Sequence, residues 1–188
     1  MDARGMTALA TRLADRGIRV VRFEFGYMAS RRAGVRKPPP RAETLLDEYS
    51  AVVTEVGGRP VIGGRSMGGR VASMIADELH AAGAIAGLAC VSYPFHPPSK
   101  PEQLRTAHLT GLRTPTLIVQ GTRDPFGTPD EVAGYGLSPA IDVLWLEDGD
   151  HDLTPRKAVS GFGAAEHLDT AADAVAQFVR RVAAREEG

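Results

Sequence analysis

The sequence has few cysteines, no long apolar run and almost no net charge, and each of these features excludes a class of protein. It holds a single cysteine, Cys90, so no disulfide can form within the chain, and we expect a reducing, cytoplasmic location. No stretch approaches the roughly 18 consecutive apolar residues of a membrane-spanning helix, and residues 1–5 lack the basic-then-apolar start of a secretory leader. The formal net charge is only −1. We therefore expect neither nucleic acid nor a membrane as partner.

What is present suits a globular core. Hydrophobic residues make up 43% of the chain and charged residues 24%, a composition typical of one soluble domain, which we expect to span residues 1–188. Cys90 lies within the apolar run 84–91, so we interpret it as a small buried core residue.

Helix-like and strand-like patterns alternate along the chain. Apolar residues recur at helical spacing, and these stretches predict helices at 6–13 (ending at Gly17), 45–56, 71–79 and 171–184. Short apolar runs between them predict strands at 18–25, 60–63, 84–92, 116–120 and 141–146. This alternation predicts an α/β fold, a three-layer α/β/α sandwich around a mostly parallel sheet. Residues 31–40, rich in basic residues and proline, are expected to form a surface loop, with a clamp for an anionic substrate as the alternative.

The segment Gly64-Arg65-Ser66-Met67-Gly68 stands between a predicted strand and a predicted helix. That context is required by a G-x-S-x-G nucleophile elbow, in which a strained turn lifts the serine hydroxyl above the sheet. We expect a Cβ at either outer glycine to collide with a neighbouring element. The turn also places the Met67 N–H at a helix N-terminus, where it favours a developing oxyanion.

A serine becomes a nucleophile when a histidine, oriented by a carboxylate, removes its proton. Functional groups of a parallel sheet gather beyond the carboxyl ends of its strands. Asp124 follows the predicted strand 116–120, and His151 follows 141–146. The chain order Ser66, Asp124, His151 is the one associated with this elbow.

Asp150 and Asp152 flank His151 and are alternative orienting carboxylates. We rank Asp124 first, because sequence neighbours seldom reach the Nδ1–H of an adjacent imidazole.

The other histidines fall into two groups. His96 follows the strand 84–92 on the same edge, so both a plain loop role and a substrate contact stay open. His80, His108 and His167 lie in or near helical patterns and are predicted to be surface residues.

The spacing of the polar residues does not favour a metal or a nucleotide. The sequence contains no H-x-x-x-H or C-x-x-C pattern, and the glycine-rich stretch 63–70 lacks the lysine of a phosphate-binding loop. We therefore expect no cofactor and no metal.

Five segments taken together resemble a small, lidless branch of the α/β-hydrolase superfamily related to dienelactone hydrolases. They are 22–28, 64–68, 92–98, 121–127 and 149–153, and they occur in the order seen in that family and span nearly the whole chain. The resemblance implies Ser66 as nucleophile, His151 as base, Asp124 as its orienting carboxylate and Met67 as one oxyanion donor.

The chain departs from that pattern in two places. Gly26 stands where relatives usually have proline. Relatives also begin with a strand and an oxyanion loop that lie beside the nucleophile strand, whereas residues 1–3 align with the positions just after that loop. We therefore expect the native start to lie upstream of Met1. Direct pairing of 18–25 with 60–63 is the alternative, because an unpaired strand 60–63 would leave backbone groups without partners.

These observations predict a serine hydrolase that acts on a small ester or thioester through an acyl-enzyme. The segment between Tyr93 and Thr116 is too short for a helical lid, which disfavours long-chain lipids. The alternative is a non-catalytic interaction protein that retains the elbow, and lyase or perhydrolase chemistry on the same scaffold also stays open. The predicted pocket walls are Tyr27, Met28, Tyr93, Phe95 and His96, and Arg65 is expected near the entrance as a further substrate contact.

Overall fold

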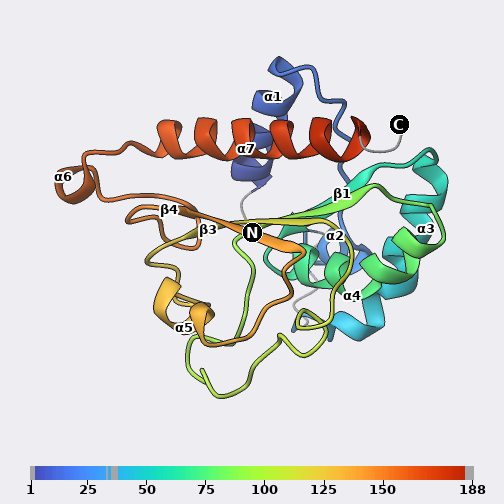
Figure 1. Cartoon of the computed structure of the whole chain (residues 1–188), viewed down its shortest axis with the longest axis horizontal. Helices are drawn as coiled ribbons and strands as arrows, with labels where there is room; N and C mark the ends of the chain where they lie inside the picture. The colour runs from blue at the N-terminus through green and yellow to red at the C-terminus, as the bar shows by residue number, and fades with distance from the viewer. Residues whose placement is uncertain (1–2, 33, 35–37, 185–188) are drawn as a thin grey trace.

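Four parallel strands form one sheet at the centre of the computed structural model, which describes residues 3–32, 34 and 38–184 (Figure 1). The strand order is β1-β2-β3-β4, so each strand lies beside its neighbour in sequence. The registers pair Ile62 with Leu88, Cys90 with Ile118 and Ile118 with Val143. The strands are β1 (Val61–Arg65), β2 (Gly87–Val91), β3 (Thr116–Gly121) and β4 (Ile141–Leu146).

Helices cover both faces of the sheet, which confirms the predicted three-layer α/β/α sandwich. Helices α1 (Ala3–Asp15) and α7 (Ala164–Ala184) lie on one face, and α3 (Leu46–Val56) and α4 (Met67–Ala81) lie on the other (Figure 1). The shorter helices are α2 (Gly26–Arg32), the 3₁₀ helix η1 (Ala42–Leu45), α5 (Pro129–Ala133) and α6 (Lys157–Ser160).

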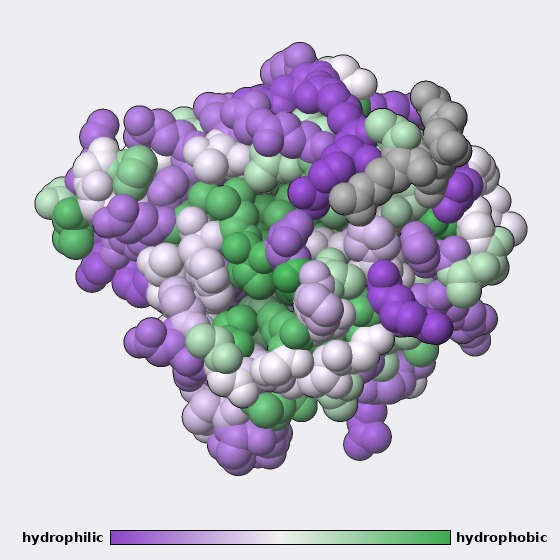
Figure 2. All heavy atoms as spheres, in the orientation of Figure 1, coloured by the Kyte–Doolittle hydropathy of each residue, from purple (hydrophilic) through white to green (hydrophobic). Residues whose placement is uncertain are grey.

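The core consists of two apolar clusters, one on each face of the sheet. Because successive strand residues point to opposite faces, Leu117 and Val119 of β3 pack with α1 and α7, whereas Ile118 packs with α3 and α4. Helix α7 buries one stripe, including Val175 and Phe178, and its outer side is hydrophilic (Figure 2). The helix predicted at 171–184 therefore exists but begins earlier, at Ala164.

The strand predicted at 18–25 is absent, because this segment has no strand to pair with. Residues 18–25 are irregular, and Val21 is 51% exposed. The alternative pairing with 60–63 is also wrong, since β2 is the one strand that β1 pairs with in the described chain. High β-propensity reflects packing and pairing within a sheet, and this segment has neither along most of its length.

A side chain occupies part of the free edge of β1 in place of a strand. The Tyr49 hydroxyl accepts a hydrogen bond from the Gly63 N–H at 2.9 Å and donates one to the Gly63 carbonyl at 2.5 Å. The rings of Phe23 and Phe25 pack against Tyr49, with centroids 5.1 Å and 6.2 Å away. Tyr49 thereby supplies hydrogen-bond partners to two partly buried backbone groups at this edge.

The basic, proline-rich loop expected at 31–40 begins later, because Arg31 and Arg32 belong to α2, and residues 33 and 35–37 lie outside the described part of the chain. Cys90 is a core residue as expected: it is 1% exposed, and burial raises the pKa of its thiol to about 12. None of the helices in the described ranges combines the length and apolar character that crossing a bilayer requires.

Candidate active site

Ser66 sits in a strained turn between the end of β1 and the start of α4. Its φ of 52° and ψ of −118° lie in a region that residues other than glycine rarely adopt. The Ser66 N–H donates to the Val91 carbonyl at 2.9 Å, and the Ser66 carbonyl accepts from the Arg70 N–H at 3.0 Å. The sheet and the first turn of α4 therefore hold this backbone from both sides.

The glycines around the turn differ in what they allow. A Cβ at Gly64 would lie 2.7 Å from the Gly68 carbonyl carbon, and a Cβ at Gly69 would lie 2.8 Å from the Gly64 oxygen. At Gly68 a Cβ would meet no heavy atom within 4 Å. The expectation that both outer glycines are required by crowding is therefore wrong for Gly68. The close approach of β1 and α4 involves Gly64 and Gly69 instead.

The imidazole of His151 lies between the Ser66 hydroxyl and the Asp124 carboxylate. Its Nε2 is 3.0 Å from Ser66 Oγ, and its Nδ1 is 2.9 Å and 3.1 Å from the two oxygens of Asp124. Asp124 is fully buried, whereas the His151 side chain is 22% exposed. When Nδ1–H donates a hydrogen bond to the carboxylate, Nε2 carries no proton and can accept the proton of the serine.

Two further donors fix the orientation of the Asp124 carboxylate. Gln120 Nε2 donates to Oδ2 at 2.9 Å, and the Phe126 N–H donates to Oδ1 at 2.9 Å. The Gln120 Oε1 in turn accepts from the Tyr93 N–H at 2.7 Å. Sequence reasoning missed Gln120, although an amide at the end of the otherwise apolar strand 116–120 is a signal for a buried polar role.

The loops that carry Asp124 and His151 are bonded to each other. The Arg123 N–H donates to the Gly149 carbonyl at 2.9 Å, and the Asp148 N–H donates to Thr122 Oγ1 at 2.8 Å. Hydrogen bonds from Arg156 and the nearby charge of Arg123 hold the pKa of the Asp148 carboxyl well below its usual range. These hydrogen bonds fix the distance between the loop after β3 and the loop after β4.

His151 has further contacts through its ring and its backbone. The Phe126 ring packs against the imidazole, with centroids 4.3 Å apart and an interplanar angle of 32°. Arg65 donates from Nη2 to the His151 carbonyl at 3.0 Å and forms an ion pair with Asp152. Arg65 therefore contacts the loop of His151, a role that its position beside the serine did not reveal.

Asp124 contacts the imidazole and the two alternative carboxylates do not do so. Asp150 accepts from the backbone N–H groups of Asp152 and Thr154, and Asp152 pairs with Arg65. Both acids are thus engaged in the turn that carries His151.

Several residues predicted to form the pocket wall lie in the core instead. Tyr93 and Phe95 are fully buried, and His96 is 2% exposed with its Nδ1 3.0 Å from the Pro97 carbonyl. In the segment after β2, the Phe95 ring contacts Tyr135, which follows α5, at 6.0 Å between centroids. The His96 Nε2 lies 3.5 Å from the Glu131 carboxylate and has no hydrogen-bond partner within the described residues.

Tyr27 and Met28 are half-buried in α2 and pack against the same core cluster as Met67. Two histidines predicted at the surface are more enclosed than expected. His167 is 3% exposed with its Nδ1 3.0 Å from the Leu153 carbonyl, and His108 is half-buried with its Nε2 2.8 Å from Ser73 Oγ.

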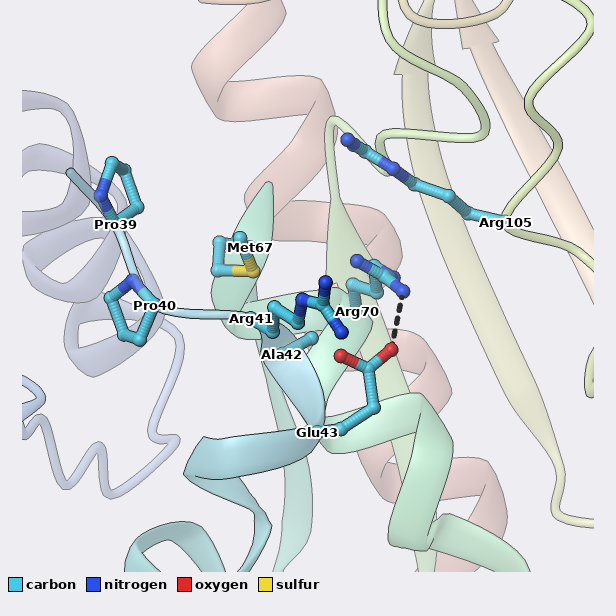
Figure 3. Close-up of a pocket in the computed structure, with 8 residues that line it drawn as sticks. All are labelled: Pro39, Pro40, Arg41, Ala42, Glu43, Met67, Arg70 and Arg105. Carbon is cyan, nitrogen blue, oxygen red and sulfur yellow. Dashed lines mark hydrogen bonds and ion pairs between the residues drawn. The ribbon is translucent and has the colours of Figure 1, made fainter.

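A pocket of about 540 Å³ adjoins the turn of Ser66 through the side chain of Met67 (Figure 3). Its lining comes from the segment before α3, from the first turn of α4 and from the segment between β2 and β3. The lining residues are Pro39, Pro40, Arg41, Ala42, Glu43, Met67, Arg70 and Arg105. Within the described ranges, no group of three or more His, Cys, Asp or Glu side chains could hold a metal ion.

The parallel sheet, the strained serine turn and the order of the three contacting side chains together define an α/β-hydrolase-like protein. A sequence model of the family described as "Alpha/beta hydrolase domain" matches residues 1–180, so the chain belongs to that family.

Solved structures show the same fold. The esterase domain of a Rhodothermus marinus protein superposes with a TM-score of 0.66 at 14% identity, covering 96% of this chain and 80% of that one. An alpha-beta serine hydrolase homologue from Coxiella burnetii superposes with a TM-score of 0.64 at 20% identity, covering 96% and 77%.

Proposed function

We propose that this α/β hydrolase is a serine hydrolase that cleaves small esters or thioesters through an acyl-enzyme intermediate. The observation that carries the proposal is the 3.0 Å separation of His151 Nε2 and Ser66 Oγ, with Asp124 on the opposite ring nitrogen. A nucleophile within hydrogen-bond reach of a base that a third group orients is the arrangement required for covalent acyl transfer.

In the proposed first step, Ser66 Oγ attacks the substrate carbonyl carbon while His151 Nε2 takes the hydroxyl proton. The carbonyl oxygen becomes an oxyanion, which the Met67 N–H stabilises, because the first N–H groups of a helix have no partner within the helix. Collapse of this intermediate expels the alcohol or thiol, which leaves with the proton from His151. Ser66 then carries the acyl group.

In the second step, water replaces the leaving group. His151 Nε2 takes a proton from the water as its oxygen attacks the acyl carbon, and the second tetrahedral intermediate expels Ser66 Oγ. The proton returns to Ser66, and the carboxylic acid leaves. Asp124 stabilises the imidazolium in both steps through its bond to Nδ1.

The segment that could cover the site limits the size of the substrate. Residues 94–115, all of which the structure describes, contain no helix. A small acyl chain therefore suits the site better than a long lipid chain, which needs a larger apolar enclosure.

A fluorophosphonate probe tests the proposal directly, because it labels activated serines covalently. We expect stoichiometric labelling of the intact protein, loss of labelling in Ser66→Ala, and unchanged labelling in Ser99→Ala, which alters an exposed serine as a matched control. Hydrolysis of p-nitrophenyl acetate should follow the same pattern. Absence of both labelling and hydrolysis in well-folded protein would overturn the proposal and favour a non-catalytic interaction protein.

A further inference from the structure

The pocket beside Met67 carries more positive than negative charge. Three arginines line it, Arg41, Arg70 and Arg105, against a single carboxylate, Glu43 (Figure 3). Glu43 contacts Arg70 at 3.0 Å between Oε1 and Nη2. One carboxylate cannot balance three guanidinium groups, so the pocket has an excess of cationic hydrogen-bond donors.

Arg70 has a donor that no group of the described chain satisfies. Its side chain is 18% exposed, and its Nε is buried without a hydrogen-bond partner. Buried donors are nearly always paired, so this one leaves the Arg70 guanidinium short of acceptors. Arg70 follows Ser66 by one helical turn, and this spacing places both residues on the same side of α4.

The surroundings of Arg70 show the same excess of charge. Burial first, and then the charge of Arg70, lowers the pKa of the Arg105 guanidinium, and the same two causes lower the pKa of His108. The negative charge of an anion between Arg70 and Arg105 would reduce this repulsion, and guanidinium groups are the preferred hydrogen-bond donors for carboxylate and phosphate oxygens.

We propose that this pocket binds an anionic group of the substrate, a carboxylate or a phosphate, so that the preferred substrate is a short ester or thioester bearing a second, negatively charged end. The inference rests on the proposed function for its link to Ser66. Arg70 and Arg105 contact the anion, Arg41 adds charge at the exposed rim, and Glu43 opposes binding. The sequence offered an anion clamp within residues 31–40 as an alternative. In the structure the cationic side chains that line the pocket are instead Arg41, Arg70 and Arg105, and only Pro39 and Pro40 of that segment contribute to the lining.

The test compares two substrates with the same glutaryl chain, mono-p-nitrophenyl glutarate and its neutral methyl ester. For the intact chain we expect the ratio of kcat/KM, anionic over neutral, to exceed 1. The ratio should fall about tenfold in Arg105→Gln and rise in Glu43→Gln, because charged hydrogen bonds are lost or opposing charge is removed. Arg113→Gln is the matched control, since that side chain is 82% exposed and lies outside the pocket lining.

Competition distinguishes the two anions. If the pocket is built for carboxylate, glutarate inhibits competitively at lower concentration than inorganic phosphate, and the reverse order indicates phosphate. A ratio at or below 1 that neither Arg105→Gln nor Glu43→Gln changes would overturn the inference while leaving the proposed function intact.

Failure of the proposed function gives a different pattern, in which neither ester is hydrolysed and no probe labels Ser66. In that case the proposed anion site is tested by measuring the binding of the anions alone. Thermal stabilisation by glutarate or inorganic phosphate that is lost in Arg105→Gln but kept in Arg113→Gln supports the anion site, and no stabilisation by either anion overturns it.

Discussion

The two sides of the candidate active site are built in different ways. The serine side consists of β1 and the first turn of α4, and it depends on close backbone packing: Ser66 has a strained φ, and Gly64 leaves no room for a Cβ. The histidine side consists of the loops after β3 and β4, and it depends on side-chain hydrogen bonds, with Asp124 bonded to Gln120 and to the Phe126 N–H.

This difference indicates how each side should fail. Added volume should damage the serine side, because packed backbone cannot shift to accept a methyl group. Loss of a hydrogen bond or a charge should damage the histidine side, because its geometry is held by polar contacts. Adding a methyl group therefore tests the serine side, and replacing a polar group by one of the same shape tests the histidine side.

The largest effect is expected from an isosteric change on the histidine side. Asp124→Asn keeps the shape but removes the charge and favours the wrong imidazole tautomer, so we expect kcat to fall by about 10³–10⁴ with little change in KM. Steady-state hydrolysis of p-nitrophenyl acetate measures this. Asp150→Asn, which alters a carboxylate that does not contact the imidazole, is the control, and a comparable loss there would contradict the assignment of Asp124.

Two glycine substitutions test the serine side by volume alone. Gly64→Ala places a Cβ 2.7 Å from the Gly68 carbonyl carbon, and we expect a loss of at least about 3 kcal/mol in the free energy of unfolding. Gly68→Ala meets no heavy atom within 4 Å and should stabilise α4 by about 0.5–1 kcal/mol. Urea denaturation measures both. Equal destabilisation by the two would show that the approach of β1 to α4 is not what restricts this turn.

The hydroxyl of Tyr49 tests the edge of β1. Tyr49→Phe removes the donor and the acceptor that serve the Gly63 carbonyl and N–H, so we expect a loss of about 1–3 kcal/mol in the free energy of unfolding. Tyr27→Phe, in a half-buried tyrosine of α2, is the control for the same chemical change. If the two variants are equally stable in urea, the hydroxyl of Tyr49 does not hold this edge.

The smallest effect concerns acid sensitivity on the histidine side. The folded protein holds the pKa of Asp148 below its unfolded value of about 3.9, so the stabilisation is fully present above that pH and is lost as the pH falls through the folded pKa. Melting temperatures measured between pH 5 and pH 2 should fall less steeply in Asp148→Asn than in the unsubstituted chain. Parallel slopes would show that the Arg156 contacts of Asp148 do not contribute to acid unfolding.

Prediction from the sequence succeeded where local pattern and chain order sufficed. The strands 116–120 and 141–146 were placed to within a residue, because each is a short apolar run bounded by turn residues that also has a neighbouring strand to pair with. The segment 18–25 has the same local pattern but is irregular in the structure. Its residues favour a strand only in the presence of a neighbour that pairs with it.

The prediction that Tyr93 and Phe95 line the pocket was wrong for a related reason. Tyr93 and Phe95 follow β2 at the expected edge, yet both side chains are buried, with Tyr93 against Ser73 of α4 and Phe95 against Tyr135. Chain position gives the edge of the sheet at which a residue emerges, whereas the direction of its side chain depends on what packs above it.

By itself the sequence determined the alternation of strands and helices, the strained serine turn and the chain order of Ser66, Asp124 and His151, because periodicity, glycine spacing and strand ends are local properties. Only the tertiary structure decided that Gln120 supports Asp124, that Tyr49 covers the edge of β1 and that three arginines from distant segments share one pocket. Hydrogen bonds and charge clusters between remote segments depend on how helices pack on the sheet, and no local pattern encodes that packing.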